Sequence, residues 1–439
     1  MEERYIAAIE ISSSKVIGTV GKIHTDGQLE VIAVEQERGL EAVRHGVIQN
    51  LEETSMRISS ILQKLQRRNT IAPRKIIGVF VGLSGRSMRS LTARASLSLS
   101  DDTEITEEIL ERLRRQALDS AVDHSLEVID AVPRNYHIGG REISSPKGML
   151  GSEISATFDL VVCRPELKRN ITRTLPDKLH VGIAGFIVTA LATGALIPSR
   201  EEKRLGCMLV DMGAETTTVT IYKNGSMCYF ATIPLGGRNI TRDITTLNVL
   251  EERAEELKLI NGVAMPRAIP SSDTRNGVKI NELDNHVLAR SGEIVANIIE
   301  QIEYAGLKSS DLPGGIIVIG GASRLNQMEQ LLQEESNMTV RRGKLPDYVQ
   351  ISDTKAQSSE LLEVVSILYA GATHSNAVCL EIPKEESLPA TGDDPGEDEY
   401  GEIPEKEKRR RNKRSKVSGW TTRISNWFGS NEDDSDSLD

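Results

Sequence analysis

The chain has 439 residues, of which 38% are hydrophobic and 27% are charged, and its formal net charge is −11 at pH 7. This length exceeds what one hydrophobic core normally supports, so we expect at least two domains. Aromatic residues make up only 3% of the chain. The low aromatic content and the negative charge argue against an aromatic-lined nucleic-acid or sugar-binding surface.

The four cysteines are scattered without any closely spaced pair, so we expect reduced thiols rather than a zinc site or a disulfide framework. The N-terminus lacks the pattern of a signal peptide, and we expect a cytosolic protein. Residues 181–197 are uncharged and approach the length of a membrane-spanning helix. Their glycines and threonines favour a buried strand at 181–188 followed by a small-residue helix at 189–197.

Strand-like apolar runs alternate with helical periodicity up to about residue 380. Because such alternation is typical of α/β proteins, we expect an α/β fold with at least two lobes. The expected strands lie at residues 5–20, 76–83, 160–163, 209–221 and 316–319. The expected helices lie at residues 56–65, 288–302, 325–332 and 361–368.

The first candidate site follows an apolar strand that breaks into Ser12, Ser13, Ser14 and Lys15. A hairpin of this kind can direct backbone N–H groups, hydroxyls and one cation at a phosphate. A serine-rich turn without a ligand explains the same pattern. The sequence therefore allows a phosphate site here without requiring one.

The second candidate site is a strand that ends at Asp211 and is followed by Gly213, Ala214, Thr216 and Thr217. Asp211 can hold a Mg²⁺-bound water, because this ion prefers one or two carboxylates together with phosphate oxygens. The pattern predicts a second phosphate-handling turn.

The third candidate site is the strand 316–319, which ends in Gly320 and Gly321. A glycine pair lets a flat ligand approach the backbone closely, although such pairs are common in α/β proteins.

The order and spacing of the three loops resemble the actin-like ATPase fold, in which two lobes close on one nucleotide. The resemblance implies that Glu255 and Lys258 form the E-x-x-K pair of the helix that contacts the adenosine. A solvent-facing helical ion pair is the alternative for these two residues.

Several stretches resemble the bacterial cell division protein family FtsA in particular. They are E-I-S-S-S-K-V at 10–16, V-G-L-S-G at 81–85, P-K-G-M-L-G at 146–151, I-P-L-G-G at 233–237 and I-T-R-D-I at 240–244. The resemblance implies a two-lobed actin-like ATPase fold with an inserted subdomain. The implied units are lobe 1 (1A) at 1–85 and 163–198, the FtsA-type subdomain (1C) at 86–162, lobe 2 (2A) at 199–235 and 302–380, and subdomain 2B at 236–301.

The last part of the chain has a different composition. An acidic and then basic linker at 381–417 should be flexible, because it has too little apolar surface to bury. In residues 418–429, Trp420, Ile424, Trp427 and Phe428 share one helical face about 100° wide, with Arg423 beside it. Basic residues followed by such a face predict a helix that binds an anionic membrane surface, and an acidic tail follows at 430–439. Docking on the protein's own core and a basic nucleic-acid patch are the alternatives.

Four residues depart from the FtsA pattern within the phosphate loops. Glu10 replaces an aspartate, Ser12 and Glu215 replace glycines, and Thr218 replaces an aspartate. Glu215 should oppose a triphosphate unless it turns away or reaches Mg²⁺, because like charges repel strongly at low dielectric. Glu10 and Asp211 are the candidates for polarising water or Mg²⁺, and we expect at most a weak ATPase.

The resemblance implies a protein that binds ATP and Mg²⁺, assembles with itself, and tethers the tubulin-like FtsZ filament to the cytoplasmic face of the membrane at the septum. Further division proteins are implied as later partners, and no nucleic acid is expected. The alternative is another actin-fold ATPase, such as a pilus-assembly homologue or a soluble kinase. The residues implied in ATP binding are Ser12, Ser13, Ser14, Lys15, Gly213, Ala214, Thr216, Thr217, Gly236, Gly237, Glu255, Lys258, Gly320, Gly321, Ala322 and Arg324.

Overall fold

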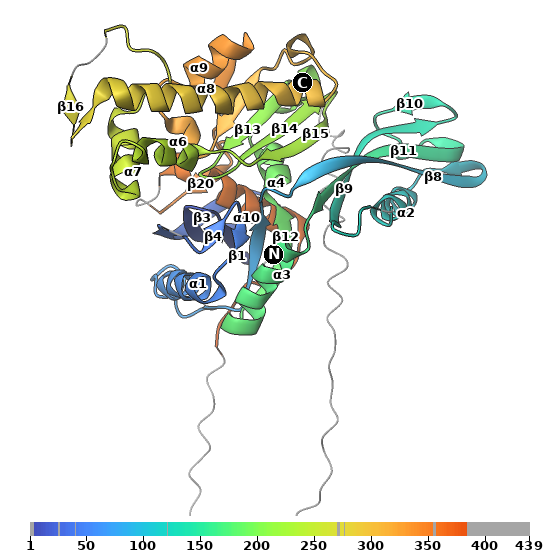
Figure 1. Ribbon diagram of the computed structural model, residues 1–439. Coiled ribbons are helices and arrows are strands. Elements are labelled where there is room, and N and C mark those ends of the chain that lie inside the picture. The colour runs from blue at the N-terminus through green and yellow to red at the C-terminus, as the bar shows by residue number, and fades with distance from the viewer. Residues whose placement is uncertain are drawn as a thin grey trace, which may run out of the picture.

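The computed structural model describes residues 4–24, 27–39, 41–120, 122–269, 273–275, 277–353 and 357–383. Figure 1 shows two α/β lobes, one above the other, with a smaller unit projecting to the side. The predicted linker beyond residue 383, the membrane helix and the acidic tail lie outside the described residues.

Lobe 1 is built on a six-stranded sheet in the order β12-β7-β1-β2-β3-β20. Its helices α1 and α10 cover opposite faces. Gly18 and Gly21 of β2 are three residues apart and therefore lie on opposite faces of the strand, where they face Ile61 of α1 and Leu368 of α10 respectively. The elements are β1 (Arg4–Ile11), β2 (Lys15–Ile23), β3 (Leu29–Arg38), β4 (Val43–Arg44), β5 (Val47–Ile48), α1 (Leu51–Gln66), β6 (Lys75–Ile76), β7 (Gly78–Leu83), α3 (Glu166–Thr172), η1 (Arg173–Lys178), β12 (Gly182–Val188), α4 (Thr189–Leu196), β20 (Val349–Ile351), η4 (Ser358–Glu360), α10 (Leu362–His374) and β21 (Leu380–Glu381).

Lobe 2 contributes the strands β15-β14-β13-β18-β19 of a nine-stranded sheet. The long helix α8 packs on β14 and β15, and α6 packs on α7 and α8. The elements are α5 (Arg200–Leu205), β13 (Cys207–Met212), β14 (Thr217–Lys223), β15 (Ser226–Ile233), α6 (Gly237–Thr245), α7 (Glu251–Asn261), β16 (Thr274–Arg275), β17 (Val278–Lys279), α8 (Ile280–Tyr304), η2 (Ser309–Asp311), β18 (Ile316–Ile319), η3 (Ala322–Arg324), α9 (Met328–Ser336) and β19 (Val340–Arg342).

The projecting unit has its own hydrophobic core and is formed by β8 (Arg89–Glu104), α2 (Glu107–Leu118), β9 (Glu127–Ile138), β10 (Arg141–Ile143) and β11 (Leu150–Cys163). Its strands continue the sheet of lobe 2, because Arg89 of β8 pairs with Ala231 of β15. The Phe230 backbone N–H also donates to Ser90 Oγ at 3.0 Å. The unit therefore follows lobe 1 in the chain but joins the sheet edge of lobe 2.

Several predictions from the sequence are confirmed, and two of the expected strands are wrong. The expected lobe 2 range 302–380 is also wrong at its end, because β20 pairs into the lobe 1 sheet and α10 packs on that sheet. Residues 316–319 form one strand, and residues 181–197 divide into β12 and α4 as expected. The runs 5–20 and 209–221 are each a hairpin rather than one strand, because their polar turns reverse the chain. None of the described helices is long and apolar enough to cross a membrane, and all four cysteines are free thiols.

Close helix packing fixes the identity of Gly371, whereas Gly292 faces open space. A Cβ on Gly371 of α10 would lie 2.4 Å from the Phe80 ring, and a Cβ on Gly292 of α8 would have no neighbour within 4 Å. We expect Gly371→Ala to lower the free energy of unfolding by about 1–3 kcal/mol through overpacking. The matched Gly292→Ala should raise it by about 0.5–1 kcal/mol through helix propensity. Urea unfolding of both variants measures the difference, and equal midpoints would contradict the packing argument.

Candidate functional site

The first loop, residues 12–14, turns β1 into β2, the two central strands of the lobe 1 sheet. Ser12 closes the turn, because its backbone N–H and its hydroxyl both donate to the Lys15 carbonyl at 3.0 Å. Ser13 Oγ accepts the Gly46 N–H at 3.1 Å, and the Ser14 carbonyl accepts the Gly39 N–H at 3.0 Å. Hydrogen bonds within the turn and to Gly39 and Gly46 therefore fix the conformation of the loop.

The second loop, residues 213–216, turns β13 into β14 in lobe 2. The first amides of α6 cover it, because the Gly237 and Arg238 N–H groups donate to the Gly213 and Ala214 carbonyls at 3.0 and 2.6 Å. Gly236 permits this approach, since a Cβ there would lie 2.6 Å from the Gly213 carbonyl oxygen. The glycines predicted in these two stretches therefore lie together, and they pack backbone against backbone.

The third loop follows β18 and lies beside the end of β13. Gly320 has a positive φ of 86°, and a Cβ there would lie 2.4 Å from Asp211 Oδ1. A Cβ on Gly321 would have no neighbour within 4 Å. Arg324 turns away toward Glu360, to which its Nη1 donates at 2.9 Å. Gly320 thus lets the Asp211 carboxyl lie against the backbone, and Gly321 leaves open space next to it in the loop.

The predicted E-x-x-K pair lies on α7 against α6. Lys258 Nζ donates to Glu255 Oε2 at 2.7 Å, to Thr241 Oγ1 at 2.9 Å and to the Gly237 carbonyl at 3.1 Å. Burial lowers the pKa of Lys258, and Glu255 partly offsets that effect. Thr217 is also turned inward, because its hydroxyl donates to the Leu235 carbonyl at 2.9 Å. Lys258 therefore ties the α7 pair to the glycine turn that begins α6.

Three carboxyls, those of Glu10, Asp211 and Glu363, lie close enough between the first and third loops to act on one another through their charge, and Glu10 and Glu363 are buried. The pKa of Glu10 is raised to about 7, chiefly by burial and also by the charge of Glu363. Lys15 lowers this pKa and offsets part of the effect. Burial, then Glu363 and Glu10, raise the pKa of Asp211. Burial also raises the pKa of Glu363, which lies on α10 and which the sequence argument missed.

This group contains a polar atom that its neighbours leave unbonded. Glu10 is only 7% exposed, and its Oε2 has no hydrogen-bond partner. Within the described ranges, no cluster of three or more His, Cys, Asp or Glu side chains is placed to hold a metal ion. A magnesium ion typically takes one or two carboxylates and completes its coordination with phosphate oxygens or water.

Glu215 lies buried among arginines rather than facing open solvent. Arg44 and Arg242 each donate to its Oε1 at 2.9 Å, and Arg238 donates at 3.2 Å. Burial raises the pKa of Glu215, but the His45 N–H, Arg44 and Arg238 outweigh that effect and hold it at about 2. The expected repulsion of a triphosphate is therefore balanced by cations that the sequence argument missed.

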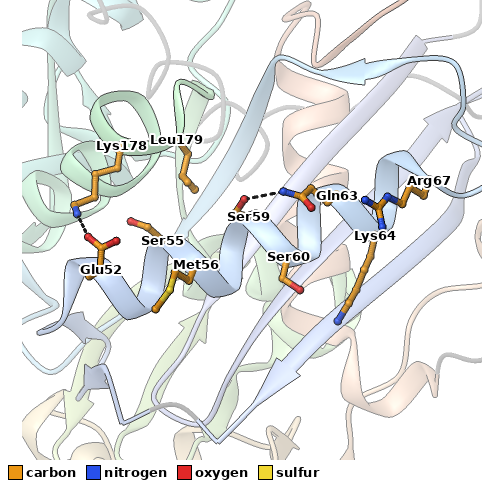
Figure 2. Close-up of a pocket in the computed structure, with 10 residues that line it drawn as sticks. All are labelled: Glu52, Ser55, Met56, Ser59, Ser60, Gln63, Lys64, Arg67, Lys178 and Leu179. Atoms are coloured by element: carbon orange, nitrogen blue, oxygen red, sulfur yellow. Dashed lines mark hydrogen bonds and ion pairs between the residues drawn. The ribbon is translucent and has the colours of Figure 1, made fainter.

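Two hollows lie away from the three loops. The larger, of about 970 Å³, lies between the projecting unit and the two lobes, and its lining includes Arg134, Lys203, Lys223 and Lys344. The other is a groove of about 560 Å³ along the outer face of α1. Figure 2 shows Lys178 reaching Glu52 and Gln63 donating to Ser59 in this groove. No predicted site residue lines either hollow.

Comparison with known proteins identifies the family. The model of "Cell division protein FtsA" matches residues 208–361, and that of the "SHS2 domain inserted in FTSA" matches residues 85–162. The chain belongs to the FtsA family. Curated FtsA proteins are 28% identical over 354 residues in Porphyromonas gingivalis (77% of this chain, 73% of that protein) and over 365 residues in Bacillus subtilis (80% of each).

A solved structure, the PilM-PilN type IV pilus biogenesis complex, has a similar fold. Its TM-score is 0.60 at 14% identity, and the match covers 83% of this chain and 98% of that one. At this identity the likeness concerns the fold alone. The FtsA resemblance and the actin-like α/β fold with an inserted FtsA-type domain, both expected from the sequence, are confirmed.

The buried carboxyls predict a dependence of stability on pH in the nucleotide-free protein. Since the pKa of Glu10 is raised from 4.5 to about 7, the folded state binds the proton more tightly than the unfolded state. The free energy of unfolding should therefore fall as pH rises through this window, by up to roughly 3 kcal/mol from Glu10.

Urea unfolding across the same pH range, with Glu10→Gln and wild type compared, measures this effect. The variant should show a shallower loss of stability with rising pH. Glu108→Gln, a change at an exposed position on α2, is the matched control and should follow the wild type. Parallel curves for Glu10→Gln and wild type would contradict the assignment.

Proposed function

We propose that this FtsA-family chain binds ATP with Mg²⁺ between its lobes, assembles with copies of itself, and tethers FtsZ filaments to the cytoplasmic face of the membrane at the division septum. The main support is that polar loops from both lobes come together around the buried Glu10, whose Oε2 lacks a partner. Family membership supports the role in division.

The described residues fit a nucleotide with its phosphates toward the first two loops. Ser12, Ser13, Ser14 and Lys15 would hold phosphates through amides, hydroxyls and one cation. Lys15 is suitably placed, because its Nζ donates to the Glu360 carbonyl at 3.1 Å and its charge acts on the nearby Glu10 and Asp211. Bound Mg²⁺-ATP supplies phosphate oxygens and a divalent cation that both lobes can contact at once.

The other predicted residues would serve the remaining parts of the ligand. Asp211 and Glu10 would hold water molecules around the cation. The open space beside Gly321 would admit the adenosine. Glu255 and Lys258 would border it from α7, with Lys258 held in place by the Gly237 carbonyl.

Removing the Lys15 cation should weaken nucleotide binding without unfolding the protein. We expect Lys15→Ala to lower ATP affinity about 10-fold or more, because a charged hydrogen bond contributes roughly 1.5–3 kcal/mol. Titration of a fluorescent ATP analogue in the presence of Mg²⁺ measures this loss. Lys75→Ala, at an exposed position of lobe 1, is the control and should bind as the wild type does. Equal ATP affinity of the two variants would contradict the assignment of Lys15 to the nucleotide site.

The membrane role rests on the terminal segment, which lies outside the described residues. The last described strand, β21, pairs with β6 of lobe 1, so the tail continues from that lobe. Its proposed membrane-binding residues are Trp420, Arg423, Ile424, Trp427 and Phe428. One short amphipathic helix binds weakly, and self-assembly would combine many such anchors into stable attachment.

Co-sedimentation with anionic liposomes tests the tether and the partner together. We expect FtsZ to pellet with liposomes when the full-length chain is present, and to stay in solution with a truncation that ends at Val417. FtsZ without its C-terminal peptide is the control for specific capture. Liposome binding without FtsZ recruitment would contradict the adaptor role, and equal recruitment by the truncation would contradict the anchor.

A further inference from the structure

Glu215 is a single carboxylate enclosed by cations from both lobes. It is 1% exposed, and its Oε1 accepts bonds from Arg44 of lobe 1 and from Arg238 and Arg242 of α6 in lobe 2. Its Oε2 accepts the His45 N–H at 2.7 Å. The carboxylate thus connects two parts of the chain that are 171 residues apart.

A tight hairpin of lobe 1 presents Arg44 and His45 to lobe 2. β4 and β5 pair with Arg44 opposite Val47, which leaves His45 and Gly46 as a two-residue turn. Both turn residues have positive φ, 48° and 79°, as a type I′ hairpin requires. The hairpin geometry therefore fixes the direction of the His45 N–H.

The same turn also holds the first loop. The N–H of His45 donates to Glu215 and the next N–H, that of Gly46, donates to Ser13 Oγ at 3.1 Å. A third bond joins the lobes, because His45 Nδ1 lies 3.2 Å from the Glu215 carbonyl oxygen. Loops from both lobes are thus fastened to one two-residue turn.

The charges around Glu215 exceed what one carboxylate needs. Three guanidinium groups contact one oxygen of Glu215, whereas the other carboxylates near them are peripheral. Glu251 lies 3.7 Å from Arg238 and is half exposed, and the exposed Glu41 acts on Arg44 through its charge. Guanidinium groups match carboxylate and phosphate oxygens equally well in geometry. The arrangement therefore suits an anion with more charge than a carboxylate carries.

We propose that Arg44, Arg238 and Arg242, together with the His45 N–H, form an anion-binding site between the lobes, which takes phosphate or carboxylate groups and which Glu215 occupies as a built-in ligand. Glu215 then holds the two lobes together without any nucleotide. A chain with glycine at this position would have to recruit an external anion to make the same connection.

The inference is tested by distance measurements on the full-length protein in the absence of nucleotide. Spin labels at Met56→Cys on α1 and Leu259→Cys on α7 report on the lobes from exposed positions, 60% and 72% exposed. A Cys228→Ala background removes the one cysteine that is not fully buried. Pulsed electron double resonance then gives the distribution of distances between the lobes.

We expect Glu215→Gly to lengthen the distance between the labels and to lower the ratio of closed to open molecules by roughly 100-fold or more, since it removes a buried ionic contact. Arg44→Gln should open the lobes from the other side, so the result does not depend on one variant. Glu251→Gln, which removes a carboxylate that lies in the same lobe as Arg238, is the matched control and should keep the short distance.

Inorganic phosphate distinguishes an anion site from a simple latch. Added in millimolar amounts, it should restore the short distance in Glu215→Gly and leave the wild type unchanged. An unchanged distance in both Glu215→Gly and Arg44→Gln would overturn the proposal, and so would an opened Glu215→Gly that phosphate fails to close. Because no nucleotide is present, the outcome is independent of whether the chain binds ATP, which the Lys15 titration decides.

Discussion

The placement of charge between the lobes is the constraint on which this structure depends. Burying an unpaired charge is expensive, so each buried ion between the lobes needs a compensating partner or a bound proton. Glu215 meets the requirement with arginines, whereas burial raises the pKa of Glu10, Asp211 and Glu363. Glu215 is therefore held in its ionised form, whereas the environment of the other three carboxyls favours protonation.

The contrast explains how a sequence with acidic departures can retain the FtsA architecture. Glu215 adds a negative charge to a loop that would face phosphates, yet Arg44, Arg238 and Arg242 compensate for it locally. Glu10 keeps the carboxyl chemistry of the aspartate it replaces. In this chain Glu215 thus joins the lobes through buried ionic contacts, while Gly236 lets the turn before α6 approach the second loop.

The sequence allowed prediction of those features whose signal is local. The apolar run at 316–319 and the polar breaks after Ile11 and Met212 each mark an element boundary that the structure contains. The sequence alone predicts that Glu215 repels a phosphate, because it does not reveal the compensating Arg44. Arg44 is 171 residues away and lies on a two-residue strand, which has no periodic pattern. Arg238 and Arg242 offered a better signal, since their spacing of four places both on one face of a helix.

The projecting unit has a consequence for how the two lobes can move. It is covalently connected to lobe 1 through the chain before Arg89, yet its β8 is hydrogen-bonded to β15 at the edge of lobe 2. Arg134 strengthens the second attachment by donating to the Cys228 carbonyl at 2.8 Å. Any rotation between the lobes must therefore either break the β8–β15 pairing or move the whole unit together with lobe 2. In the second case the position of the unit relative to lobe 1 follows the angle between the lobes.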